Sequence, residues 1–268
     1  MIEVLCPVCG KPLQTENAAW RCDGGHSFDV AHQGYVNLLT VSQKHSREPG
    51  DSRTMVAARR EFLDSGVYQP IADTLCRLAE PGKPASILDV GCGEGYYLGC
   101  LAERLPDAER WGLDISKEAV RRAAARDKTA HWLTATAVRL PFPDGSFDCL
   151  ISMFALTAEE EFARVLKPGG IFLQVIAGEN HLMGLKNLIY PEIIKKEKVL
   201  HPVLEGFSLE HSETLRFAFT LRGNRQIENL LSMTPHFMRI TKEGAERAAA
   251  AETLTDEAEV VFNCYRKK

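Results

Sequence analysis

One short segment, residues 87–95 with the sequence ILDVGCGEG, limits the fold of this chain more than any other. An apolar run ends in Asp89, and three glycines then alternate at Gly91, Gly93 and Gly95. The apolar run predicts a buried strand, and glycines allow a tight turn whose backbone N–H groups can approach a ligand closely. The spacing G-x-G-x-G after an acid differs from the G-x-G-x-x-G of dinucleotide-binding proteins. For the glycines alone, a purely structural turn is the alternative.

The chain after this loop supplies further parts of a parallel α/β sheet. Residues 96–105 carry apolar side chains at helical spacing, and residues 110–114 predict a second short strand that ends in Asp114. A doubly wound sheet places an acid at this strand tip, where its carboxylate can accept both hydroxyls of a ribose. The alternative role for Asp114 is to cap the helix that follows it.

Two later segments complete a recognisable pattern. They are LPFPDGSFDCLIS (140–152) and EEEFARVLKPGGIFLQVI (159–176). Together with D-x-G-x-G-x-G, they resemble the class I S-adenosylmethionine-dependent methyltransferases over roughly residues 68–176. The resemblance implies an α/β, Rossmann-like fold with a seven-stranded sheet and S-adenosyl-L-methionine as cofactor.

The resemblance also implies roles for particular residues. Backbone around the glycines would hold the methionine and ribose parts of the cofactor, and Asp89 would brace the loop by accepting its N–H groups. Many relatives carry an acid shortly before LPF, whereas this chain reads LTATAVRLPF, so residues 134–137 offer the adenine only backbone and hydroxyl groups. The predicted cofactor-binding set is Tyr68, Asp89, Gly91, Gly93, Glu94, Gly95, Tyr96, Asp114 and His181.

The N-terminus carries a second pattern, a set of metal ligands. Cys6 and Cys9 form C-x2-C, and Cys22 and His26 follow as C-x3-H after a twelve-residue spacer. Four such ligands at this spacing are typical of tetrahedral zinc, and a closed set of four leaves no position for catalysis. A disulfide arrangement would leave an odd cysteine, and His26 alone could instead cap or pack. The sequence therefore predicts structural Zn²⁺.

Composition limits the partners and the compartment. The other five cysteines are scattered in apolar contexts and predict buried thiols of a reducing compartment: Cys76, Cys92, Cys100, Cys149 and Cys264. No apolar run reaches the length of a membrane span and no signal-peptide pattern opens the chain, so we expect a cytoplasmic protein without membrane partners. The net charge of −4 excludes a broadly basic nucleic-acid binder.

RNA contacts would therefore depend on local basic patches. The candidates are Lys44, His45, Arg47, Arg53, Arg59, Arg60, Lys186, Lys195, Lys196 and Lys198. A solvated helix face is the alternative for each of these sets.

The pattern of segments predicts three parts. Residues 1–34 form the zinc module, residues 35–67 a linker and helix, and residues 68–268 the methyltransferase domain. GYVNLL (34–39) is expected to be a short strand or packing segment, and the polar loop 40–54 is long enough to indicate mobility or contact with substrate. A helical segment after residue 178, a long strand over 206–221, a helix over 224–236 and a closing antiparallel strand over 259–267 complete the sheet.

A finer resemblance covers nearly the whole chain. The segments that carry this resemblance are the zinc ligands, GYVNLL, SREPGDSRTMVAARREFLDSGVYQP, DVGCGEGYY, GENHLMGLK, LRG and SMTP. In these segments the chain resembles the bacterial 23S ribosomal RNA (guanine-N1)-methyltransferases, the RlmA and tylosin-resistance enzymes. This resemblance implies methylation of N1 of a guanine in a 23S rRNA hairpin loop, with the zinc module recognising the RNA. It also implies a homodimer with a shared RNA cleft.

The same resemblance places Tyr68 and His181 at the cofactor. Their alternatives are a buried aromatic at a helix start and a helix-capping histidine. Glu179 and Asn180 could meet the base edge, and Tyr96, Tyr97 or Phe154 could stack on the base. No residue identifies itself as the acceptor of the N1 proton, so the catalytic residues stay unknown.

Two other functions remain open at this stage. One is a small-molecule methyltransferase, because the same fold serves many substrates. The other is a non-catalytic zinc-ribbon RNA-binding protein with a degenerate Rossmann-like domain. The zinc module argues against the first, and the intact Asp89, glycines and Asp114 argue against the second.

Overall fold

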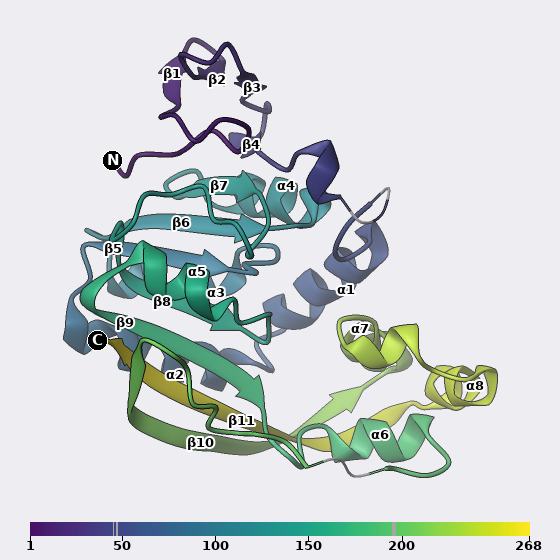
Figure 1. Ribbon diagram of the computed structural model, residues 1–268. Helices are drawn as coiled ribbons and strands as arrows, with labels where there is room; N and C mark the ends of the chain where they lie inside the picture. The colour runs from purple at the N-terminus through teal and green to yellow at the C-terminus, as the bar shows by residue number, and fades with distance from the viewer. Residues whose placement is uncertain (45, 47, 195–196) are drawn as a thin grey trace.

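The main sheet of the protein has eight strands in the order β10-β11-β9-β8-β5-β6-β7-β4 (Figure 1). The computed structural model describes residues 1–44, 46, 48–194 and 197–268. The strands are β4 (Tyr35–Asn37), β5 (Ser86–Val90), β6 (Glu109–Asp114), β7 (His131–Thr134), β8 (Phe147–Met153), β9 (Leu166–Ala177), β10 (Phe207–Arg222) and β11 (Thr253–Lys267).

Only β11 runs antiparallel to its neighbours β9 and β10; the other pairs are parallel. The seven expected strands are present, and the eighth, β4, comes from the GYVNLL segment and pairs with β7. In a parallel sheet the carboxyl ends of β5, β6 and β8 meet at one edge, which is where ligands of this fold class bind.

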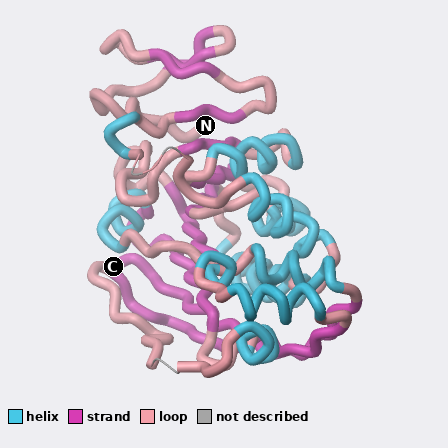
Figure 2. Tube along the Cα trace, turned by 90° about the vertical axis from the view of Figure 1, so that its right-hand side faces the viewer, coloured by secondary structure: helices cyan, strands magenta, loops and turns pink. Residues whose placement is uncertain are grey.

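Helices cover this sheet and its ends. They are α1 (Arg53–Asp64), α2 (Gln69–Ala79), α3 (Tyr96–Arg104), α4 (Lys117–Arg126), α5 (Glu159–Val165), α6 (Met183–Ile189), α7 (Asn224–Ser232) and α8 (Lys242–Ala250). Along β5, Ile87 faces one apolar core and Leu88 the other, as the two-residue period of a strand requires. Most helices gather on one side of the trace in Figure 2.

The N-terminal module is a three-stranded antiparallel sheet of β1 (Gln14–Glu16), β2 (Ala19–Arg21) and β3 (Ser27–Asp29). It contacts the main sheet directly. The backbone N–H of Ile2 donates to Glu109 at 2.8 Å, that of Leu5 donates to the carbonyl of Pro141 at 2.8 Å, and Trp20 packs edge-on against Trp111. The module is therefore a packed layer that continues into the sheet through β4.

At the other end of the sheet, α6, α7, α8 and the 3-10 segment Pro235–Met238 form what we call the helical cover (residues 183–189 and 224–250). The cover packs on α1 and β11. The Asp256 carboxylate on β11 accepts the N–H groups of Gly184 at 2.8 Å and Leu185 at 2.7 Å, at the first turn of α6. These bonds satisfy helix N-terminal donors that otherwise lack partners and tie the cover to the sheet.

Candidate functional site

The four predicted zinc ligands form one cluster. The ligand atoms of Cys6, Cys9, Cys22 and His26 lie within 4.8 Å of one another. The Cys9 and Cys22 sulfurs are 3.6 Å apart, and His26 Nδ1 lies 3.6 Å from Cys6 Sγ and 3.4 Å from Cys22 Sγ. Tetrahedral zinc with bonds of about 2.3 Å places sulfur ligands about 3.8 Å apart. The cluster thus has the ligand types, and close to the spacing, that tetrahedral zinc requires.

A glycine beside the ligands supports this fit. A Cβ on Gly24 would lie 3.0 Å from Cys9 Sγ and 3.3 Å from His26 Nδ1. Any side chain there would crowd the cluster, so Gly24 allows the chain to close around the four ligands.

The glycine loop after β5 has the backbone conformation that its sequence predicts. Gly91, Gly93 and Gly95 have φ values of 81°, 57° and 84°. A Cβ on Gly91 would lie 2.5 Å from the Cβ of Ala155, just beyond β8, and a Cβ on Gly95 would lie 2.7 Å from Trp132. Both glycines are therefore required by positive φ and by close packing.

Asp114 at the tip of β6 holds this loop. One carboxylate oxygen accepts the N–H of Gly93 at 2.9 Å, and the other accepts the N–H of Ser116 at 2.8 Å. Each oxygen can accept a further bond and Asp114 lines the cavity, so the carboxylate can still accept two hydroxyls. Burial raises the pKa of Asp114, while the two N–H donors and Arg59 lower it.

Asp89 does not brace the loop, in contrast to the expectation from the sequence. None of the described residues donates to its Oδ1, although the side chain is 1% exposed. Burial, and then the charge of Asp114, raises the pKa of Asp89 to about 8. Asp89 is therefore mostly protonated at neutral pH, and Asp114 does the bracing because its carboxylate is aligned with the N–H of Gly93.

Tyr68 and His181 lie side by side in the same pocket. Their ring centroids are 6.4 Å apart, and the buried Tyr68 hydroxyl has no partner among the described residues. Burial raises the pKa of Tyr68 well above its usual value. Burial, with help from Lys186 and Lys198, lowers the pKa of His181 to about 4.

His181 is fixed in one tautomer. Its Nδ1 accepts the backbone N–H of Glu259 at 3.3 Å, so the proton of the neutral ring lies on Nε2. The Glu259 carboxylate in turn accepts the backbone N–H of Asn180 at 3.1 Å and a bond from Arg216 at 2.8 Å. This network positions the loop that carries His181.

Two of the predicted cofactor residues have structural partners. Glu94 is 1% exposed, and its carboxylate pairs with Arg126 of α4 at 2.8 Å. The hydroxyl of Tyr96 donates to Gln69 at 3.0 Å, and its ring lies under Arg126. Both residues still border the pocket.

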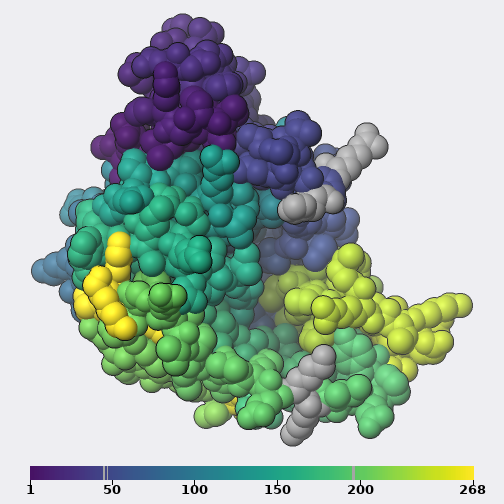
Figure 3. Space-filling model, in the orientation of Figure 1, coloured from purple at the N-terminus to yellow at the C-terminus, as the bar shows by residue number. Residues whose placement is uncertain are grey.

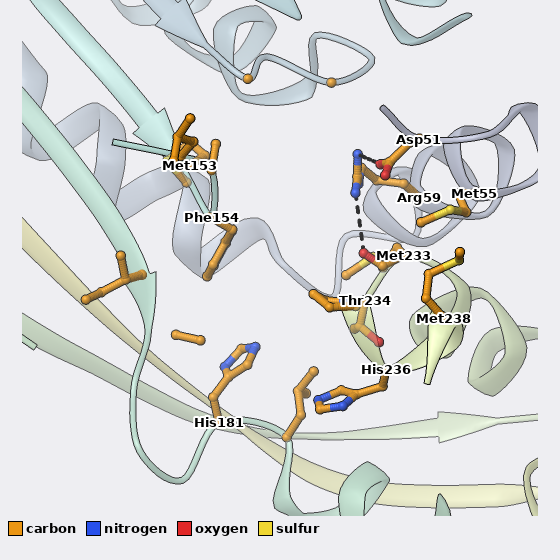
Figure 4. A pocket seen from close by; sticks show the side chains of 18 of the residues that line it. Asp51, Met55, Arg59, Met153, Phe154, His181, Met233, Thr234, His236 and Met238 are labelled. Atoms are coloured by element: carbon orange, nitrogen blue, oxygen red, sulfur yellow. Dashed lines mark hydrogen bonds and ion pairs between the residues drawn. The ribbon is translucent and has the colours of Figure 1, made fainter. Parts of the chain in front are cut away.

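A single large cavity joins these residues. Its volume is about 1540 Å³, and it runs from the glycine loop and the tips of β6 and β8 to the helical cover. Figure 3 views the hollow between the body of the main sheet and the wall formed by α1 and the cover, and Figure 4 shows Phe154, His181 and His236 pointing into it. Of the adenine candidates, residues 135–137 line it, whereas Thr134 does not.

The basic residues predicted as RNA contacts differ in whether they face the cavity. Arg59 points into the cavity, while Arg53 pairs with Glu118, Arg60 pairs with Asp64, and Lys198 donates to backbone carbonyls at the end of β9. Lys44 is exposed and Lys186 borders the cavity. His45, Arg47, Lys195 and Lys196 lie outside the described residues.

Sequence reasoning missed the cavity wall formed by the helical cover and α1. Met55, Met233, Met238 and His236 line it, together with Asp51. Asp51 and Met55 lie in SREPGDSRTMVAARREFLDSGVYQP and Met233 lies in SMTP, two segments that the resemblance included without assigning a role to these residues.

The fold and this pocket define a class I S-adenosylmethionine-dependent methyltransferase. A methyltransferase-domain model matches residues 87–170, and a model for the RlmA N-terminal zinc ribbon matches residues 4–47. The structure is also similar to phosphoethanolamine N-methyltransferase 2 of Haemonchus contortus bound to S-adenosyl-L-methionine, with a TM-score of 0.50 and 17% identity over 81% of this chain and 57% of that chain. This likeness concerns the fold alone.

Two relatives are similar over most of the chain. A protein of Micromonospora griseorubida, described as a candidate 23S rRNA (guanine-N(1)-)-methyltransferase, is 34% identical over 97% of this chain and 96% of its own length. The 23S rRNA (guanine(748)-N(1))-methyltransferase of Streptomyces fradiae is 41% identical over 67% of this chain and 65% of its own length. The chain belongs to the 23S rRNA (guanine-N1)-methyltransferase family. No helix among the described residues is long and apolar enough to cross a membrane.

The pocket fits the cofactor of this class. Tyr68, Asp89, Asp114 and the three glycines all line the cavity, and the buried Tyr68 hydroxyl and Asp89 Oδ1 have no partner among the described residues. Buried polar groups without partners are rare in folded proteins, so these atoms indicate a bound ligand. The predicted zinc is supported in the same way by the cluster of four ligands.

Proposed function

We propose that this protein transfers the methyl group of S-adenosyl-L-methionine to N1 of a guanine in a hairpin loop of 23S rRNA. The observation that carries the proposal is the continuous cavity, which has nucleoside-type binding groups at the strand tips and aromatic and imidazole groups at the other end. Family membership supports the choice of rRNA. As part of the same proposal, the chain divides at residues 34 and 67, works in the cytoplasm and forms a homodimer.

On the cofactor side, the proposed binding residues are those predicted from the sequence. Asp114 accepts the ribose hydroxyls, the glycine backbone lines the methionine part, Tyr68 supplies a donor, and Asp89 lies beside the loop, where it can ionise as the cationic cofactor binds. The bound cofactor supplies an already activated methyl group, so the chain acts mainly by holding the reacting atoms in line.

On the base side, Phe154 and His181 form the proposed guanine slot. Phe154 has a φ of 54°, is 41% exposed, and stacks on His181 with ring centroids 6.0 Å apart. A left-handed aromatic residue is strained and is usually held in place for function. Tyr96 and Tyr97 are less suited because both are buried. His181 Nε2–H can donate to guanine O6, which distinguishes guanine from adenine.

His236 is the proposed acceptor of the N1 proton. Its Nδ1 lies 2.9 Å from the hydroxyl of Tyr190, and the ring faces the cavity (Figure 4). Burial and the nearby Lys186 and Arg239 lower the pKa of His236, so the ring is neutral at pH 7 and able to take a proton. His181 cannot take this role without breaking its bond to the Glu259 backbone.

The small-molecule alternative is less well supported. A demethylmenaquinone methyltransferase of Bacillus licheniformis is 33% identical, but over only 44% of this chain. Two rRNA methyltransferase relatives match far more of the chain, over 97% and 67% of its length. The module contains Lys11 and Arg21 against Glu3, Glu16, Asp23 and Asp29, so its proposed RNA contact does not rest on net positive charge.

Primer extension on 23S rRNA tests the proposal. A methyl group on the Watson–Crick edge stops reverse transcriptase, so a strain lacking the gene should lose one stop that the wild-type gene restores. Asp114→Ala should not restore it, whereas Asp107→Ala, a change at an exposed acid outside the cavity, should restore it fully. An identical stop pattern with and without the gene would reject rRNA as the substrate.

A further inference from the structure

An ion pair inside the cavity has no role in the fold described so far. Arg59 of α1 places Nη1 2.5 Å from Asp51 Oδ2, and its Nη2 lies 3.4 Å from the backbone carbonyl of Met233 (Figure 4). The Arg59 side chain is 28% exposed. The pair therefore spans the cavity from the segment before α1 to the helical cover.

The Arg59 guanidinium lies over the glycine loop. A Cβ on Gly93 would lie 3.5 Å from Nη1 and 3.8 Å from Cδ of Arg59. The charge of Arg59 also lowers the pKa of Asp114, the acid that holds the same loop. Arg59 is thus placed beside the part of the pocket assigned to the methionine portion of the cofactor.

Asp51 is held beside the loop by the backbone on either side of it. Its carbonyl accepts the Ser116 hydroxyl at 2.8 Å, and a Cβ on the preceding Gly50 would lie 2.9 Å from Ile115 and Ser116 side-chain atoms. These contacts hold Asp51 against Ile115 and Ser116, the two residues that follow Asp114 at the tip of β6.

An arginine and an aspartate side by side are complementary to an α-amino acid, which carries one carboxylate and one ammonium group. We propose that Arg59 and Asp51 bind the amino-acid end of S-adenosylmethionine, with Arg59 taking the carboxylate and Asp51 the ammonium. The planar fork of arginine matches a carboxylate with two parallel bonds. The Arg59–Asp51 bond is then exchanged for two bonds to the ligand.

The neighbouring arginines on α1 show that this placement is selective. The Arg53 and Arg60 side chains are 84% and 40% exposed and pair with Glu118 and Asp64, outside the cavity. An arginine that served only to attract RNA phosphates would be expected at such exposed positions. Arg59 instead lies within the cavity, next to acids.

Calorimetric titration with two nucleosides tests the inference, which rests on the proposed function because it takes the pocket to be a cofactor site. S-Adenosylhomocysteine carries the amino-acid end, and 5′-methylthioadenosine lacks it. We expect Arg59→Gln to weaken S-adenosylhomocysteine binding about 10-fold or more, as loss of a charge-assisted bond to the ligand does, and to leave 5′-methylthioadenosine binding within about twofold.

Further variants separate the roles. Arg59→Lys should fall between wild type and Arg59→Gln, because it keeps the charge but loses the fork, and Asp51→Asn should weaken S-adenosylhomocysteine alone. Arg60→Gln is the matched control and should change neither ligand. Equal weakening of both nucleosides by Arg59→Gln, or no weakening of either, would overturn the inference. Wild-type protein that binds neither nucleoside rejects the cofactor pocket itself, and the inference with it.

Discussion

The zinc module and the helical cover are both additions to the ends of one sheet, but they are held in different ways. Four ligand atoms within 4.8 Å of one another close the module, and its buried apolar side chains are few. The cover is held by apolar packing on α1 and β11 and by the carboxylate of Asp256. The comparison teaches that a small module can depend on one metal site, whereas a cavity wall depends on contacts distributed over distant parts of the chain.

Removing zinc should have the largest effect and should be confined to the module. Structural zinc in small modules supplies about 10–16 kcal/mol of apparent binding free energy. A strong chelator should therefore make the chain cleavable by trypsin after Arg21, while cleavage within residues 224–250 stays slow. Cys22→Ala should lose the metal, measured as zinc per protein chain. Cys100→Ala, outside the cluster, should keep it, and a protein that resists trypsin without zinc would contradict the comparison.

Asp256→Ala should loosen the cover and leave the module intact. The change removes a buried acceptor of two N–H groups of α6, and bonds to a charged group contribute about 1.5–3 kcal/mol each. We expect a loss of about 3 kcal/mol of unfolding free energy in denaturant titrations, with faster amide exchange over residues 183–189. Glu257→Ala changes the adjacent exposed acid and serves as the control. Unchanged exchange in α6 would show that packing alone holds the cover.

The pocket between the two additions should respond to pH through Asp89. The folded-state pKa of Asp89 is raised to about 8, so its contribution to stability is complete below about pH 4 and declines as pH rises toward 8. A cationic ligand favours the ionised form, so cofactor binding should release up to one proton and become tighter as pH rises from 6 to 8. Calorimetry in buffers of different ionisation enthalpy measures this release. Asp89→Asn should abolish the proton release, and release that persists would assign it elsewhere.

The smallest expected effect is on the salt dependence of RNA binding. Arg239 is exposed at the rim of the cavity on the cover, whereas the module carries more acids than bases. Arg239→Gln should reduce the slope of log affinity against log salt by about one unit, and Lys11→Gln should leave it unchanged. Titrations of rRNA fragments at several salt concentrations make this comparison. A larger effect from Lys11 would place the electrostatic contact on the module instead.

The sequence predicted the parts of the site that depend on local patterns. The zinc ligands follow a fixed spacing. The loop after β5 was predicted from its alternating glycines, and their φ values are positive in the structure. The tip of β6 follows from strand order in a parallel sheet. In each case the residues that act together are close in the chain or are related by one repeated βα unit.

The rest could not be predicted because it depends on contacts between distant segments. Arg59 and Met233 are 174 residues apart yet in contact, and the two segments that carry them gave no indication that they would meet. Asp89 was assigned the role that Asp114 has, because both acids end strands and only the geometry shows which one faces the N–H of Gly93. GYVNLL is too short for its pattern to reveal that it would extend the main sheet.

The contact between Gly91 and Ala155 has a mechanical consequence. A Cβ on Gly91 would lie 2.5 Å from the Cβ of Ala155, so the glycine loop and the end of β8 are in direct contact. Phe154 is the residue before Ala155, so a displacement of the loop would press on the segment that carries the ring of the proposed guanine slot. The two sides of the proposed site are coupled through this contact, and a side chain added at residue 91 would disturb both at once.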